Sequence, residues 1–211
     1  MVIKLINTVI ISIIAGKVIY AVPVMFAVGL LLRVILKKTP NYEKGSKFNK
    51  WCIGISECIV FMMYMKFDYS LSLIKGIAML AIFLFTSVCD IKTRNLENYV
   101  SIMLMLVGLI GVSIPTMFFN SITMLIAFAF MLACAIISKN QIGGADVKFI
   151  PVCFFVLGAA RGITGLIMGL AFAVIGTLIR NKVKKISDPT EKQTLPLLPY
   201  MSAAFMTTYL F

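Results

Sequence analysis

Two aspartates stand out among the few acidic residues of this sequence because of where they occur. Asp90 comes directly after the third apolar run of the chain, and Asp146 follows the fifth. Two carboxyl groups held within a few ångström cannot both ionise cheaply, so they share a proton at working pH. The ionised one can deprotonate a water, and the protonated one can donate to a peptide carbonyl. The two residues are therefore candidates for aspartic-protease chemistry, provided that the fold brings them together.

The glycines before Asp146 allow two interpretations of that position. Gly143 and Gly144 interrupt a helical run and permit backbone geometries that other residues avoid. Irregular backbone at membrane depth is tolerated where it lines a wet or protein-buried cavity. On the residues alone, a flexible turn with an ordinary capping aspartate also fits. Both interpretations stay open at this point.

The elements that must hold these aspartates lie in a lipid bilayer. Apolar residues make up 61% of the 211 residues and charged residues 13%, against about 45–50% and about 25% in soluble domains. A chain this apolar cannot bury its apolar side chains in one core and still present a polar surface. The composition excludes a soluble enzyme, a disordered tail and a fibrous protein.

Apolar runs alternate with short polar breaks and predict an all-α, polytopic membrane helical bundle of about eight transmembrane helices. Residues 1–211 are expected to form a single integral membrane domain, because no polar stretch is longer than a loop. Pro23 is expected to kink the first run, unless the first turns of that run lie at the interface. The start resembles a signal peptide, but Lys17 and further apolar sequence follow, which predicts a retained first span. The expected spans are residues 10–36, 51–65, 71–89, 99–118, 122–138, 147–160, 163–179 and 196–211.

Basic residues predict the orientation of these spans, because Lys and Arg accumulate in cytoplasmic loops. Eight spans place the loops 37–50, 90–98, 139–148 and 180–195 on one side, and these loops hold 14 of the 20 Lys and Arg residues. Both termini are therefore expected outside, with both aspartates at the cytoplasmic face of the cell membrane. Topology and contact with anionic lipid account for the net charge of +12, so no nucleic-acid partner is expected.

The residues around both aspartates resemble a known family. Residues 143–148, Gly-Gly-Ala-Asp-Val-Lys, are similar to the G-x-G-D-[VI]-K signature of type IV prepilin peptidases, which are GxGD-type membrane aspartic proteases. The first motif of that family runs roughly D-x-x-x-R-x-I-P-N, and Asp90, Arg94, Leu96 and Asn98 stand in its register. The resemblance therefore rests on two motifs that occur in the expected order.

The resemblance covers about residues 82–211, because residues 195–200 are similar to the proline-bracketed final span of the family. Two departures leave the catalytic groups in place. Ala145 stands where the signature has its second glycine, and Glu97 replaces the common proline. The second departure makes the chain less rigid after Leu96.

The resemblance implies that Asp90 and Asp146 are the catalytic pair. Arg94 and Lys148 could support the site, or they could be ordinary anchors at the cytoplasmic face, and both alternatives stay open. The supporting residues that the family pattern implies are Arg94, Gly143, Gly144 and Lys148.

The resemblance further implies the reaction and its partners. The family cuts the short basic leader from prepilin or pseudopilin substrates at the cytoplasmic face, just before their hydrophobic helix, and so serves type IV pili and protein secretion. Some members also methylate the new N-terminus and carry a large insert with paired CxxC motifs. The loop 37–50 is short and has no cysteine, so we expect a peptidase-only form without zinc, S-adenosylmethionine or another cofactor.

Two further points stay open on the sequence. Glu57 lies inside the second apolar run, where a charge is costly without a partner, so it is either protonated or paired with Lys75. The alternative function is a small proton- or cation-coupled membrane transporter or channel, but its expected inverted repeats are missing from the glycine pattern. The particular substrate, the oligomeric state and the substrate groove are not specified by the sequence.

Overall fold

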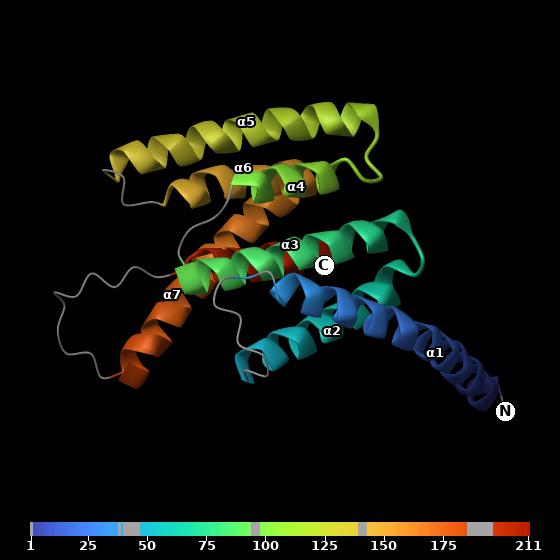
Figure 1. Ribbon diagram of the computed structural model, residues 1–211. Coiled ribbons are helices and arrows are strands. Elements are labelled where there is room, and N and C mark those ends of the chain that lie inside the picture. Colours follow the sequence, from blue (N-terminus) through green and yellow to red (C-terminus); the bar gives the residue numbers. More distant parts are fainter. Residues whose placement is uncertain (1, 38, 40–46, 94–97, 139–142, 185–195) are drawn as a thin grey trace.

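The computed structural model describes residues 2–37, 39, 47–93, 98–138, 143–184 and 196–211. Within these ranges all regular secondary structure is helical, which confirms the expected all-α membrane bundle (Figure 1). The helices are α1 (Val2–Lys37), α2 (Lys47–Phe67), α3 (Leu71–Thr93), α4 (Asn98–Gly108), α5 (Ile114–Ile137), α6 (Gly144–Leu157), α7 (Ala159–Lys184) and α8 (Leu198–Leu210).

Four of these helices are long and apolar enough to cross a membrane. They contain the segments Ile19–Lys37, Leu71–Thr93, Ile114–Ile137 and Ala159–Arg180, of 19 to 24 residues each. A span needs about 20 residues at about 1.5 Å per residue, so these lengths match the hydrocarbon thickness. The first of them lies in α1, which continues as one helix through Pro23.

The boundary between the fourth and fifth helices differs from the expected one. Spans over 99–118 and 122–138 were predicted, but α4 ends at Gly108 and α5 begins at Ile114. Gly111 takes a positive φ of 67° in the turn between them, and Pro115 occupies the first turn of α5. Glycine adopts that φ without strain, and proline suits a helix start because it lacks an N–H. Apolar residues continue through the turn, which is why hydropathy alone misplaced it.

The core of the bundle is formed largely by α3, α6 and α8, which carry most of the fully buried large side chains. The rings of Phe83 and Phe149 lie 5.7 Å apart and join α3 to α6. Figure 1 shows α5 with α4 and α6 on one side of α3, and α1 with α2 on the other. Both α3 and α6 extend through the core along their length, so the two termini of each helix lie at opposite ends of the bundle.

Close packing of α7 against α8 depends on glycines of α7. A Cβ atom on Gly165 would lie 2.4 Å from the Phe205 ring, and one on Gly169 would lie 2.4 Å from the Met201 sulfur. Small residues at this spacing let membrane helices approach closely. The contact fixes α8 and therefore the position of its first residue, Leu198.

Candidate active site

Asp90 lies in the last turns of α3 and faces the start of α8. The carboxylate Oδ2 of Asp90 accepts a hydrogen bond from the backbone N–H of Leu198 at 3.2 Å. Leu198 is the first residue of α8, and the first N–H groups of a helix have no acceptor within it. A helix N-terminus also carries a partial positive charge. The start of α8 therefore favours the ionised form of the Asp90 carboxyl group.

This contact was missed by the sequence analysis, although a signal for it was present. Pro196 and Pro199 bracket the start of α8, and Pro199 stands in its first turn. Proline at this position marks the beginning of a helix. Asp90 and Leu198 are 108 residues apart in the chain, so only the fold identifies them as partners.

Asp146 lies in the first turn of α6, directly before the predicted span 147–160. Its backbone N–H donates to the Gly143 carbonyl at 3.0 Å, which closes the first turn. Burial and, to a lesser extent, the negative charge of Asp90 together raise the pKa of the Asp146 carboxyl from its ordinary value to about 6. The structure thus brings the two aspartates close enough to interact electrostatically, as required for a pair that shares a proton.

The two carboxyl groups have different environments. Asp90 accepts a hydrogen bond from a helix N-terminus, whereas Asp146 is partly buried and lies within range of a like charge. A donated hydrogen bond favours a charged carboxyl, and burial favours a neutral one. The arrangement can therefore hold one ionised and one protonated carboxyl side by side.

The two glycines before Asp146 act differently from what the sequence analysis expected. Gly143 has φ −61° and ψ 135°, a conformation open to any residue, so an unusual backbone is not its purpose. A Cβ atom on Gly143 would lie 3.1 Å from Oδ2 of Asp146, whereas one on Gly144 would have nothing within 4 Å. Gly143 therefore leaves space for the carboxyl group, and Gly144 has no comparable constraint.

Lys148 points toward α4 rather than toward Asp146. Its Nζ donates to Oδ1 of Asn98 at 3.0 Å. Asn98 is the first residue of α4, and the hydrogen bond joins that helix start to α6. The structure therefore connects the two sequence motifs through Lys148 and Asn98.

The remaining charged residues predicted to matter, Arg94, Glu57 and Lys75, form no part of the described surroundings of the two aspartates. Arg94, with Leu96 and Glu97, lies outside the described residues. The suggested pairing of Glu57 with Lys75 is wrong, because the Glu57 carboxylate packs over Gly29 of α1 and Lys75 donates to the Gly108 carbonyl at 3.5 Å. In the part of the chain that the structure describes, no three His, Cys, Asp or Glu side chains gather into a possible metal site.

Comparison with known proteins gives one match. The sequence model of the type IV leader peptidase family matches residues 77–179. This segment includes Asp90, Asp146 and the whole of α4, α5 and α6. No curated protein and no solved structure matched the chain.

Proposed function

We propose that this chain is a type IV leader peptidase, an aspartic-type hydrolase, because the sequence model of that family matches residues 77–179. We further propose that Asp90 and Asp146 are its catalytic pair. The observation that carries the proposal is that Asp146 is partly buried within electrostatic range of Asp90, and its burial, together with the Asp90 charge, raises its pKa to about 6. Neighbouring carboxyl groups whose pKa values are pushed apart divide the roles of acid and base.

We assign the base to Asp90 and the acid to Asp146. The Asp90 carboxylate, held by the N–H of Leu198, takes a proton from water as the water oxygen attacks the peptide carbon. Asp146 donates its proton to the carbonyl oxygen, so that this oxygen does not carry a negative charge in the tetrahedral intermediate. When the C–N bond breaks, Asp90 returns its proton to the leaving nitrogen, and Asp146 recovers a proton from the hydroxyl that becomes the new carboxyl group.

The proposed substrate is a prepilin or pseudopilin with a short basic leader and a following hydrophobic helix. The described aspartates lie at the ends of helices, which is where a peptide bond next to a membrane helix would arrive. Basic loops do not attract a basic leader, so the binding energy comes from the apolar helix of the substrate within the bilayer. A substrate with a shortened hydrophobic segment is expected to be cleaved more slowly, and equal cleavage would contradict this source of binding.

We further propose that the pair faces the cytoplasm at the cell membrane and that the chain acts as a peptidase without a methyl-transfer activity. The concentration of Lys and Arg in the loops on the side of both aspartates supports this orientation. Transfer of a methyl group to the processed substrate by the purified protein would contradict the peptidase-only form.

The catalytic assignment is tested by co-expression with candidate prepilins and sequencing of the mature N-terminus. Asp90→Asn and Asp146→Asn are each expected to lower cleavage by about 10²–10⁴-fold, the usual contribution of general acid–base catalysis. Asp68→Asn is a matched control, because Asp68 is exposed, pairs with Lys17 and has a positive φ of 49° that asparagine also tolerates. Full cleavage in either catalytic variant would remove that residue from the pair.

A further inference from the structure

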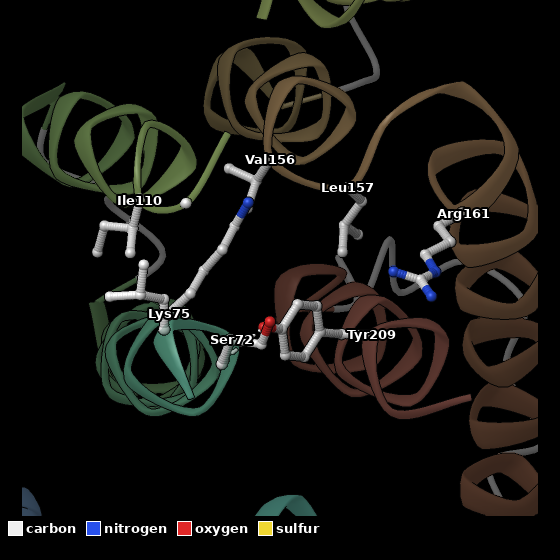
Figure 2. Close-up of a pocket in the computed structure, with 9 residues that line it drawn as sticks. Ser72, Lys75, Ile110, Val156, Leu157, Arg161 and Tyr209 are labelled. Carbon is white, nitrogen blue, oxygen red and sulfur yellow. Dashed lines mark hydrogen bonds between the residues drawn. The ribbon is translucent and has the colours of Figure 1, made fainter. Parts of the chain in front are cut away.

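A cavity lies at the end of the bundle opposite the two aspartates. It has a volume of about 210 Å³ and is lined by residues from the start of α3, the turn after α4, the end of α6, the start of α7 and the end of α8 (Figure 2). Lys75 and Asp90 are 15 residues apart on α3, which corresponds to about 22 Å along a helix. The cavity is therefore separate from the proposed catalytic site.

Two basic side chains reach into this cavity from different helices. Figure 2 shows Lys75 extending from α3 toward Val156, and the Arg161 guanidinium turning from α7 toward Leu157 and Tyr209. Arg161 is close enough for its positive charge to act on the Lys75 ammonium group. Lys75 is only 9% exposed whereas Arg161 is exposed, so solvent screens the repulsion mainly from the side of Arg161.

The described surroundings contain no carboxylate that offsets the two positive charges. The residues that line the cavity include none, and Asp68, in the connection before α3, forms its ion pair with Lys17. The polar contact of Lys75 is a 3.5 Å hydrogen bond to the Gly108 carbonyl, at the limit of hydrogen-bond length. The cavity therefore has an excess of positive charge that a bound anion would compensate.

Neutral groups around the cavity also suit an anion. Ser72 stands in the first turn of α3 and lines the cavity, and the N-terminus of a helix favours negative charge. The Tyr209 hydroxyl already donates to the Ser72 carbonyl at 2.6 Å, so the two cations remain the main donors. A volume of about 210 Å³ is below the range of about 300–1,000 Å³ for drug-sized ligands. It suits a group the size of a phosphate.

We propose that this cavity binds a phosphate group, supplied either by an anionic phospholipid headgroup of the adjacent leaflet or by free phosphate. Arg161 and Lys75 provide the charge-assisted hydrogen bonds, with Arg161 at the entrance because its side chain is exposed. Bound phosphate would tie the ends of α3 and α7 together across the cavity.

The test measures binding to the purified full chain in detergent. Native mass spectrometry compares how much phosphatidylglycerol and how much phosphatidylcholine the protein retains. The midpoint of thermal unfolding, measured as inorganic phosphate is added at constant ionic strength, reports binding of the free ion. We expect saturable binding of phosphatidylglycerol, phosphate or both, weakened about tenfold or more in Arg161→Gln, because a hydrogen bond to a charged group contributes about 1.5–3 kcal/mol. Stronger binding of the lipid identifies the headgroup as the source, and binding of phosphate alone identifies the free ion.

Matched variants keep the test decisive. Lys182→Gln removes an exposed cation from the other end of α7 and is expected to bind as the wild type does. Lys75→Gln is expected to behave as Arg161→Gln; if loss of the contact to Gly108 prevents folding, Arg161→Gln alone decides the outcome. Equal binding by the wild type and Arg161→Gln, an equal loss in Lys182→Gln, or no saturable binding would overturn the proposal.

Discussion

Each end of this helical bundle holds a pair of like charges, and α3 contributes one member of each pair. At the acidic end, the charge of Asp90 in α3 acts on Asp146 in α6; at the basic end, the charge of Arg161 in α7 acts on Lys75 in α3. A carboxyl pair can relieve its repulsion by keeping one proton, and both burial and the Asp90 charge raise the pKa of Asp146 in that direction. A guanidinium does not lose its proton in proteins, so Arg161 keeps its positive charge, which a bound anion would compensate.

Repulsion between neighbouring like charges therefore leads to different chemistry at the two ends. Retained protons make the acidic end suited to proton transfer, whereas the uncompensated charge makes the basic end suited to binding. The helix termini reinforce both outcomes, because the start of α8 donates to Asp90 and the start of α3 borders the basic cavity. The following changes test this contrast, beginning with the largest expected effect.

Removing the hydrogen bond between α8 and Asp90 should lower kcat more than the other changes described below. Leu198→Pro deletes the N–H that donates to the carboxylate. A proline there also disfavours the αR conformation of Leu197, so thermal unfolding is used to check that the variant folds. We expect kcat to fall about tenfold or more below that of Leu198→Ala, since a hydrogen bond to a charged group contributes about 1.5–3 kcal/mol. Leu198→Ala is the matched control, because it loses the buried side chain but keeps the N–H. Equal kcat in the two variants would show that the donor is not needed.

Filling the space beside Asp146 should have a smaller effect. Gly143→Ala places a methyl group 3.1 Å from Oδ2 of Asp146, so the carboxyl must shift by a few tenths of an ångström. We expect cleavage to slow by roughly tenfold, because small misplacements of catalytic groups are costly. Gly144→Ala, where nothing lies within 4 Å, should retain wild-type cleavage. The interpretation fails if both alanine variants behave alike.

Breaking the hydrogen bond between α6 and α4 should matter less. Lys148→Met removes the 3.0 Å contact to Asn98, but the lysine side chain is exposed. Exposed polar contacts contribute about 0.2–1 kcal/mol, so the midpoint of thermal unfolding should fall by only a few degrees. Asn98→Ala should lower it by a similar amount, and the double variant by no more than either single change. Additive losses would indicate that the two side chains act independently.

The smallest expected effect is that of removing a charge at the basic end on the pKa of Asp146 at the acidic end. Arg161→Gln should leave the pKa of Asp146 unchanged, because charges about 20 Å apart exceed the Debye length of about 8 Å at physiological ionic strength. Carbon-13 NMR of labelled aspartate carboxyl groups measures this pKa. A clear shift would mean that the two ends are coupled and that the contrast drawn between them is too simple.

Much of this architecture was predictable from the sequence because it depends on local patterns. Apolar runs predicted an all-helical membrane bundle, and the two motifs predicted the family that residues 77–179 match. The unpredicted features depend on contacts between distant segments. The hydrogen bond from Leu198 to Asp90 spans 108 residues, and Lys75 donates to the Gly108 carbonyl and feels the charge of Arg161 rather than pairing with Glu57. Hydropathy and spacing carry no information about such pairs, because they record only neighbours along the chain.

The raised pKa of Asp146 also predicts how stability depends on pH. Its folded-state pKa of about 6 lies above the ordinary value of 3.8, so the folded protein binds more protons than the unfolded chain between these values. The contribution of Asp146 is therefore fully favourable below about pH 4 and is lost as pH rises through about 6. Comparing thermal unfolding of the wild type and Asp146→Asn across this range measures that contribution.

The pairing of the two aspartates is tested most directly by titrating Asp146 in the presence and absence of the Asp90 charge. Carbon-13 NMR of the wild type should give a pKa of about 6 for Asp146, and Asp90→Asn should lower it by removing one of the two causes of the shift. Burial remains in that variant, so the pKa should stay above 3.8. An Asp146 pKa that is the same with Asp90 and with Asn at that position would contradict the catalytic pair.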